Sequence, residues 1–236
     1  MWEHRRSRVP LPMRRAILAL ILAAPPSAVC FASCGGKANG QPDAADAASA
    51  DRLEEPYFPD ASCPVEIDSP PLLPGIHVPV GTDITTWDSN PPSSGEHYPI
   101  WAAFQEFSTP VPRGYYVHDL EHGAIVLLYN CSLLDDAGAG SDAASDAGDA
   151  GTACDALVAG LRQVVASMPT DPMCDPSIRV RYVLTPDPLI AYPVAAAAWG
   201  WTYNASCLDL PTLEAFAHDH YAQAPENECV NGVASF

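Results

Sequence analysis

The sequence predicts a single α+β domain: a small, mainly antiparallel sheet, two helices and a Pro-rich irregular N-terminal arm. Three observations support this prediction. An apolar run of strand length follows Gly123, residues 154–168 show helical apolar spacing, and residues 178–185 alternate as strands do. A short amphipathic stretch at 211–222 comes last. The order arm, strand, helix, strand, strand, helix is typical of an α+β fold.

The first half of the domain has one irregular segment and two regular ones. Residues 56–114 are rich in Pro and aromatic residues, so we expect extended segments and turns. Residues 124–130 (AIVLLYN) are predicted to form a strand. In 154–168, Leu157, Leu161, Val164, Val165 and Met168 share one helical face, and Pro169 ends the helix.

The second half is less uniform. Residues 178–185 (IRVRYVLT) alternate as a strand does, with Arg179 and Arg181 on one face. Residues 189–203 are ambiguous: Pro193 and the aromatic residues favour a strand that bends at Gly200, whereas the Ala run favours a helix. Residues 211–222 are predicted to form a helix with Pro in its first turn.

Residues 1–33 are predicted to be a signal peptide of the lipoprotein type. Five Arg residues precede the apolar stretch 16–24, which is much shorter than the about 20 residues needed to span a bilayer. Small residues then precede Cys34, as in bacterial lipoproteins whose first mature residue is a lipidated Cys. We expect Cys34 to hold the protein on a membrane of the bacterial envelope, at its periplasmic or surface face. Plain secretion and a retained anchor remain alternatives.

Two stretches built from Ala, Asp, Gly and Ser carry no apolar face. Residues 34–52 are predicted to be a disordered tether, and residues 135–153 a disordered insert at the surface. The single globular domain is then expected to be 53–236.

Removal of residues 1–33 makes the chain strongly acidic. Five Arg and one Glu are lost, which leaves six basic against 28 acidic residues and a net charge of −22. With no basic patch remaining, we expect no nucleic-acid partner.

Six cysteines follow Cys34, an even number that favours disulfides in an exported chain. They are Cys63, Cys131, Cys154, Cys174, Cys207 and Cys229. Two pairs are favoured among the 15 connectivities that three bridges allow. Cys131 and Cys154 flank the insert, and Cys207 and Cys229 bracket the last helix.

Two neighbouring motifs, NPPSSGEHY (90–98) and VHDLEHG (117–123), hold three of the seven histidines. Imidazole is the commonest metal ligand in proteins. We therefore predict a metal site of His97, His118 and His122, with Glu121 or Glu96 as a fourth ligand or a supporting partner. Such mixed N/O donors suit zinc, copper(II) or manganese.

The histidines allow other interpretations. On a helix, His118 and His122 would share a face beside Glu121, as in the His-x-x-Glu-His motif of zinc proteases. Residues 115–117 favour a strand, however, and Gly123 would stop a helix, so we expect an extended or turn conformation. The same side chains would also serve as a structural hydrogen-bond network, or as a metal-free catalytic or ligand site. His77 receives no role, and His218 and His220 are expected at the surface.

Four segments resemble a known family, the domain of unknown function 3105. They are PPSSGEHY (91–98), VHDLEHGAIVLLY (117–129), AAAAWGW (195–201) and FAHDHYAQAPEN (216–227). The family pattern runs approximately PPTSGPHY, VHNLEHG with an apolar strand, AWG, then a helix and Pro-Glu, so the resemblance covers about 70–228.

The chain departs from that pattern at three positions: Ser93 replaces Thr, Glu96 replaces Pro, and Asp119 replaces Asn. All three departures leave the histidines in place. The resemblance implies an exported or membrane-attached protein and no established activity.

Three functions therefore remain open. The first is an exported lipoprotein domain with a His/Glu metal site. The second is a metal-dependent hydrolase with Glu121 as general base. The third is a non-catalytic interaction domain with structural histidines. The sequence does not decide whether the protein is an enzyme.

Overall fold

The computed structural model describes residues 59, 62–134, 147–234 and 236. The predicted signal peptide (1–33), the tether (34–52) and residues 135–146 of the predicted insert lie outside these residues. Within the described part of the chain, no helix is both long and apolar enough to cross a membrane.

The core of the fold is a five-stranded sheet in the order β1-β7-β6-β4-β5. The strands are β1 (Val65–Asp68), β4 (Ile125–Tyr129), β5 (Tyr182–Pro186), β6 (Val194–Ala198) and β7 (Trp201–Ala205). Only the β4–β5 pair is parallel; the other three pairs are antiparallel. The predicted α+β class with a mainly antiparallel sheet is therefore confirmed.

The central strands are buried on both faces, which explains their unbroken apolar sequences. Because side chains alternate along a strand, Ile125 and Leu127 of β4 point to one core while Val126 and Leu128 point to the other. Strand β6 does the same with Val194 and four alanines. The Ala run that resembled a helix is thus a buried strand, and the chain turns at Gly200 (φ +75°) into β7.

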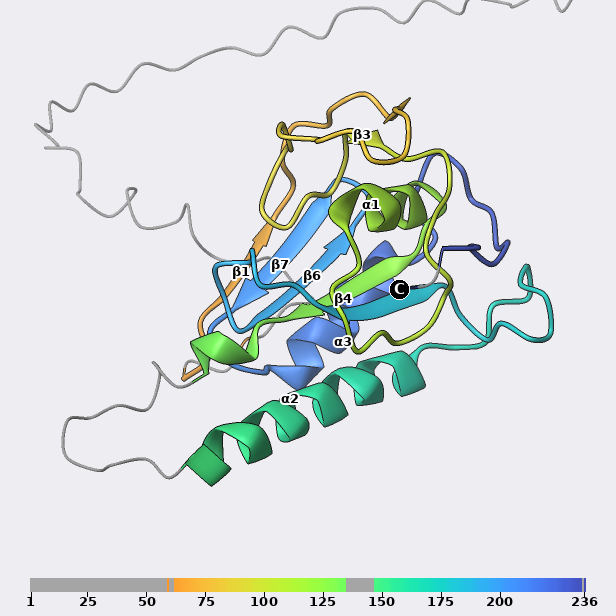
Figure 1. Cartoon of the computed structure of the whole chain (residues 1–236). Helices are drawn as coiled ribbons and strands as arrows, with labels where there is room; N and C mark the ends of the chain where they lie inside the picture. The colour runs from red at the N-terminus through yellow and green to blue at the C-terminus, as the bar shows by residue number, and fades with distance from the viewer. Residues whose placement is uncertain (1–58, 60–61, 135–146, 235) are drawn as a thin grey trace, which may run out of the picture. The chain divides into compact units, whose positions relative to one another are not determined.

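Helices cover both faces of the sheet (Figure 1). Helices α2 (Ala147–Ser167) and α3 (Leu210–His220) lie on one face, where Leu161, Leu213 and Phe216 enter the larger apolar cluster. Helix α1 (Arg113–Glu121) lies on the opposite face. The predicted helices at 154–168 and 211–222 are confirmed.

Helix α1 corrects two predictions. The described residues form three α-helices, whereas we expected two, and residues 115–117 are helical, whereas we expected a strand. Tyr116, Val117 and Leu120 fall on one face of α1 and are fully buried against the sheet. Burial of this face overrides the β preference of Tyr and Val. The helix ends where expected, since Gly123 (φ +86°) follows it and its N–H donates to the Leu120 carbonyl.

Three boundaries also differ from the predictions. Helix α2 begins at Ala147, so residues 147–153 of the predicted disordered insert are helical. The N-terminal arm is not wholly irregular, because β1 pairs with β7 at the edge of the sheet. Strand β5 begins at Tyr182, four residues later than predicted. Pairing with distant strands decides the last two boundaries, and short-range patterns do not report it.

Three disulfides join Cys63 to Cys207, Cys131 to Cys154 and Cys174 to Cys229. The predicted Cys131–Cys154 bridge is confirmed. The predicted Cys207–Cys229 bridge is wrong, because the β1–β7 pair brings Cys63 beside Cys207 from 144 residues away. Three disulfides are consistent with an extracytoplasmic protein.

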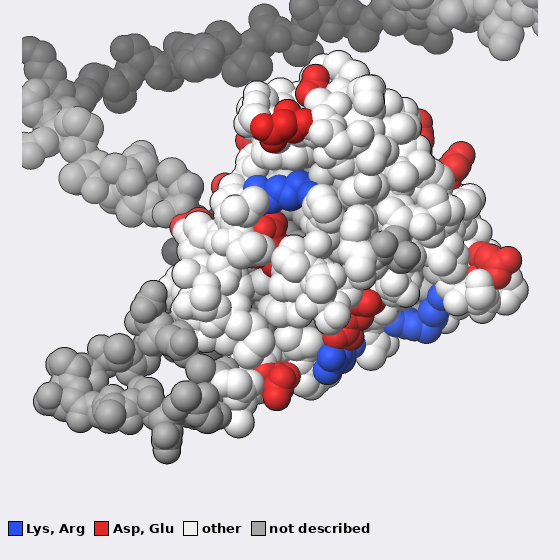
Figure 2. All heavy atoms as spheres, in the orientation of Figure 1, with Lys and Arg blue, Asp and Glu red and all other residues white. Residues whose placement is uncertain are grey.

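Each described arginine forms an ion pair or hydrogen bonds with other residues of the chain. Arg113 pairs with Asp187, Arg162 with Glu106 and Arg181 with Asp171. Arg179 donates to the carbonyls of Met168 and Val165. On the face shown in Figure 2, the few basic side chains lie apart, with acidic side chains close to them. The absence of a nucleic-acid partner stays a prediction.

Candidate metal centre

Two short strands bring the first two histidines together. Strands β2 (Ile76–His77) and β3 (Glu96–His97) pair in parallel, and their register sets His77 directly opposite His97. The Val78 N–H extends the pairing by donating to the His97 carbonyl over 2.8 Å. From the sequence we expected no role for His77. A signal for it exists, because both histidines stand two residues before a proline (His77-Val78-Pro79 and His97-Tyr98-Pro99).

The turn before His97 is held by a partly buried hydrogen-bond network. The hydroxyls of Ser93 and Ser94 both donate to the Asp88 carboxylate, and Ser94 Oγ accepts from the Leu73 N–H over 2.9 Å. Gly95 has φ +119°, a conformation that other residues rarely adopt. These contacts fix the backbone that presents His97, as a rigid support around a site should.

Helix α1 supplies the other two members of the cluster. Its apolar face, with Tyr116, Val117 and Leu120, packs on the sheet. At about 100° per residue, His118 points away from this face, and Glu121 lies about 60° from His118, at the edge of the apolar face. Burial of one face of the helix therefore orients the polar face toward His77 and His97.

The four side chains converge on one small volume. One ligand atom of each of His77, His97, His118 and Glu121 lies within 4.8 Å of all the others. Each pair among the three imidazole rings has a centroid separation of 4.8 Å. Glu121 Oε2 lies 2.9 Å from His97 Nε2 and 3.9 Å from His77 Nε2.

Backbone carbonyls determine which ring nitrogen of two histidines is free. His97 Nδ1 lies 2.8 Å from the Gly95 carbonyl, and His118 Nδ1 lies 2.6 Å from the Tyr98 carbonyl. A carbonyl only accepts, so each Nδ1 carries the hydrogen and each neutral ring keeps its lone pair on Nε2. Metal-binding histidines are usually oriented in this way by a carbonyl or carboxylate.

The contact between His97 and Glu121 lacks a proton donor when the ring is neutral. His97 is fully buried, and its Nε2 has no hydrogen-bond partner. Its lone pair therefore faces a carboxylate oxygen at 2.9 Å, and these two acceptors repel unless a cation or a proton joins them. Tetrahedral zinc with bonds of 2.0–2.1 Å holds its ligands about 3.3 Å apart, so a small widening would admit it.

The protonation state of His118 also suits a ligand. The pKa of His118 is lowered to about 4, mainly by burial; the hydrogen bond to the Tyr98 carbonyl opposes this shift, and the nearby histidines add to it. His118 is therefore a neutral imidazole near pH 7, and its free Nε2 can bind a metal without first losing a proton.

Neighbouring groups restrict how the cluster can move. The Trp101 ring lies 4.9 Å from the His118 ring and 4.4 Å from the His122 ring, measured between centroids. Gly75 lies against the carboxylate, because a Cβ at this position would be 2.3 Å from Glu121 Oε1. At the other side, the His77 side chain is 49% exposed, which leaves the cluster accessible to solvent.

His122 belongs to a second group, with His118 and Glu226, whose ligand atoms also lie within 4.8 Å of one another. His122 Nε2 is 3.3 Å from Glu226 Oε2. Of the four predicted metal ligands, the structure thus groups His97, His118 and Glu121 with His77. The fourth, His122, lies in the adjacent group. Glu96 is exposed and belongs to neither group.

A third group, Asp171 with Cys174 and Cys229, is explained without a metal. The two cysteines form a disulfide, and Asp171 accepts hydrogen bonds from Arg181 and Tyr221. The two sulfur atoms and the Asp171 carboxylate, the possible metal ligands of this group, are therefore already engaged with other protein atoms.

The fold and the cluster together define a disulfide-bridged α+β domain with converging His and Glu side chains. Residues 77–140 match the family described as "Protein of unknown function (DUF3105)". The match begins at His77 and includes His97, His118, Glu121 and His122. No curated protein and no solved structure matches the chain.

Proposed function

We propose that this domain binds one transition-metal ion through His77, His97, His118 and Glu121. One observation supports the proposal above all: the buried, unpartnered Nε2 of His97 faces the Glu121 carboxylate. Unpaired buried polar atoms are costly, and a bound cation would satisfy both groups at once.

The donor set limits the choice of ion. Three imidazoles and one carboxylate suit zinc, copper(II) or manganese better than calcium or magnesium, which prefer oxygen donors. Since His77 is half exposed, a fifth position on the ion would be open to water or to a small ligand, as in catalytic metal sites.

The proposed setting is the bacterial cell envelope. Lipidation of Cys34 would hold the domain on a membrane, and the three disulfides fit an oxidising compartment. Mass spectrometry of the exported protein tests this part. A diacylglycerol-modified Cys34 at the N-terminus is expected, whereas cleavage without lipid would make the protein simply secreted.

Elemental analysis of the exported, untagged protein, purified without chelators, tests the metal. We expect about one equivalent of a single transition metal, retained in wild type and lost in a His97→Asn/His118→Asn variant. At a free metal concentration of 100 times Kd, binding adds about 2.7 kcal/mol to stability. Chelation should therefore lower Tm by roughly 5–11 °C. Stoichiometric metal in the folded double variant would remove the proposal.

The same preparations separate the two alternatives. If the protein is a metal-dependent hydrolase with Glu121 as general base, Glu121→Gln keeps the metal and loses turnover in a screen of ester, peptide and phosphoester substrates. If Glu121 is a ligand, the same change weakens metal binding. If the histidines are only structural and the domain binds a protein partner, chelators leave Tm unchanged.

A further inference from the structure

We propose that His118, His122 and Glu226 form a second, outer site for a divalent transition-metal ion, and that this outer site shares His118 with the inner one. The inference rests on the proposed function for the inner site, and it adds a route by which the ion enters. Two imidazoles and a carboxylate are a common donor set for zinc and related ions.

The contacts of His122 carry the proposal. His122 is only 3% exposed, and its Nδ1 is buried without a hydrogen-bond partner. Its Nε2 lies 3.3 Å from Glu226 Oε2, a long contact for a hydrogen bond. The centroids of the His118 and His122 rings are 4.7 Å apart, and Trp101 packs against both. A buried imidazole with such weak partners is a group that a cation would satisfy.

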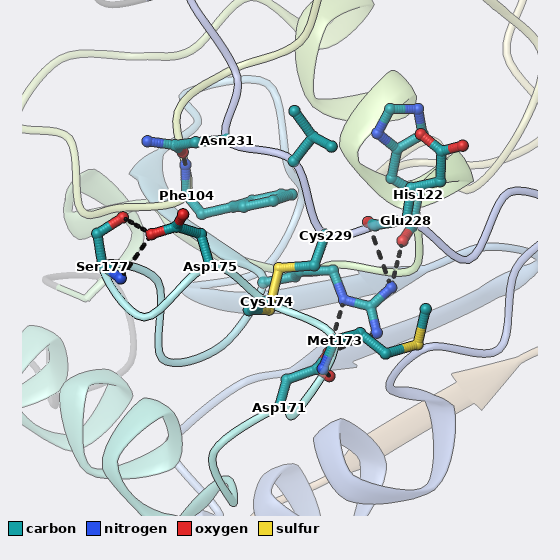
Figure 3. The surroundings of a disulfide bond; sticks show 12 residues. Phe104, His122, Asp171, Met173, Cys174, Asp175, Ser177, Glu228, Cys229 and Asn231 are labelled. Atoms are coloured by element: carbon teal, nitrogen blue, oxygen red, sulfur yellow. Dashed lines mark hydrogen bonds and ion pairs between the residues drawn. A yellow bond between two sulfur atoms is a disulfide. The ribbon is translucent and has the colours of Figure 1, made fainter.

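The segment that carries Glu226 is held against the C-terminal end of helix α1. The Glu226 N–H donates to the Glu121 carbonyl over 3.1 Å. Arg181 Nη1 donates to the His122 carbonyl over 2.7 Å and to Asn227 Oδ1 over 2.6 Å. The Cys174–Cys229 disulfide closes the segment, and Figure 3 shows this bridge with His122 and Glu228 beside it. The outer donors are therefore preorganised.

His118 can serve only one ion at a time. Its Nδ1 is bound to the Tyr98 carbonyl, so a single lone pair, on Nε2, remains. The two sites therefore compete for His118, and the protein holds one ion in total. The Glu226 side chain is 51% exposed, so an ion can bind there first. The ion then moves to the inner site: it keeps His118 as a ligand and exchanges His122 and Glu226 for His77, His97 and Glu121.

The test is a titration of the full mature chain with zinc, in competition with a chromophoric chelator. A His77→Asn/Glu121→Gln variant removes two inner ligands. His77 is half-exposed and Glu121→Gln is a conservative change, so the fold should be kept. We expect this variant to retain one weaker equivalent of zinc. Adding Glu226→Gln should weaken that binding at least about 10-fold. Adding the matched change Glu228→Gln, a nearby exposed carboxylate outside both groups, should change it less than about 3-fold. Far-UV circular dichroism checks that each variant is folded.

The outcomes separate the two proposals. If wild type binds one zinc and the folded inner-site variant binds none, the outer site is wrong and the inner site stands. If the inner-site variant binds zinc as tightly as wild type does, and Glu226→Gln abolishes binding, the inner site is wrong and the outer site stands. Two equivalents in wild type would overturn the sharing of His118. Equal effects of Glu226→Gln and Glu228→Gln would reduce the role of Glu226 to general electrostatics.

Discussion

The two faces of the sheet are built differently. On the α2/α3 face, Leu161, Leu213 and Phe216 pack in a continuous apolar cluster. On the α1 face a smaller apolar cluster is capped by buried polar side chains. These are Ser93, Ser94, His97, His118, Asp119, Glu121 and His122. The first face gains stability mainly from apolar area and leaves isolated polar atoms unpaired at Tyr203 and Thr212. The second face gathers unpaired atoms of His97, Asp119 and His122 around the metal-site cluster.

The difference indicates where stability and function are separated in this domain. When His97 is neutral, its Nε2 and Glu121 Oε2 are two converging acceptors, and such a pair destabilises a metal-free protein. A fold tolerates them when a well-packed region elsewhere compensates, and functional sites commonly have this property. Substitutions on the α2/α3 face should then alter stability alone, and substitutions beside α1 should alter metal binding.

The largest expected effect lies on the α2/α3 face. Leu161→Ala removes a fully buried side chain from the larger cluster and should lower the free energy of unfolding by about 2–5 kcal/mol. Denaturant unfolding of the metal-free protein measures this change. Zinc affinity of the folded variant should equal that of wild type, and a comparable loss of affinity would break the separation of the two faces.

Gly75→Ala should have the opposite profile. The added Cβ would lie 2.3 Å from Glu121 Oε1, so the carboxylate must move. Because Gly75 is exposed, the change should cost little folding stability. We expect zinc affinity to fall roughly 10–100-fold, as for other changes that reorient a ligand, with Tm of the metal-free protein nearly unchanged. Gly151→Ala is the control, since no atom lies within 4 Å of its Cβ. Equal affinities in the two variants would show that Glu121 is no ligand.

Glu121→Gln should stabilise the metal-free domain while weakening the metal site. The new amide can donate to His97 Nε2, which now faces an acceptor. A hydrogen bond of this kind contributes about 0.5–1.5 kcal/mol. Denaturant unfolding in excess chelator measures the gain. A loss of stability would instead show that a protonated His97 forms an ion pair with Glu121.

The smallest expected effect is a pH dependence at Asp119. Burial raises the pKa of Asp119 well above its usual 3.8, although the hydrogen bond from the Ala102 N–H lowers it. The unfolded chain then releases this proton at lower pH than the folded domain, so the domain loses stability as pH rises above about 3.8. Asp119→Asn should therefore raise Tm at pH 7 and have little effect near pH 3.5. A Tm gain of the same size at both values would exclude this cause.

Local patterns in the sequence were enough for much of the scaffold. The apolar run at 124–130 and the spacing in 154–168 and 211–222 predicted β4, α2 and α3, because side-chain periodicity reports directly which face is buried. The even number of cysteines predicted disulfides, and Cys131–Cys154 was recognisable from its position beside the insert. The two histidine motifs located the region of the site.

Tertiary structure alone decided which donors meet. Residues 115–117 are helical because the sheet buries one face of α1, and this helix orients His118 and Glu121. His77 joins them through the register of β2 with β3, and Glu226 through the return of the C-terminal segment past Arg181. These contacts join residues tens of positions apart, and a local sequence pattern carries no information on such distances. The sequence by itself therefore determined the class of fold and the kind of chemistry, and long-range packing selected the ligands.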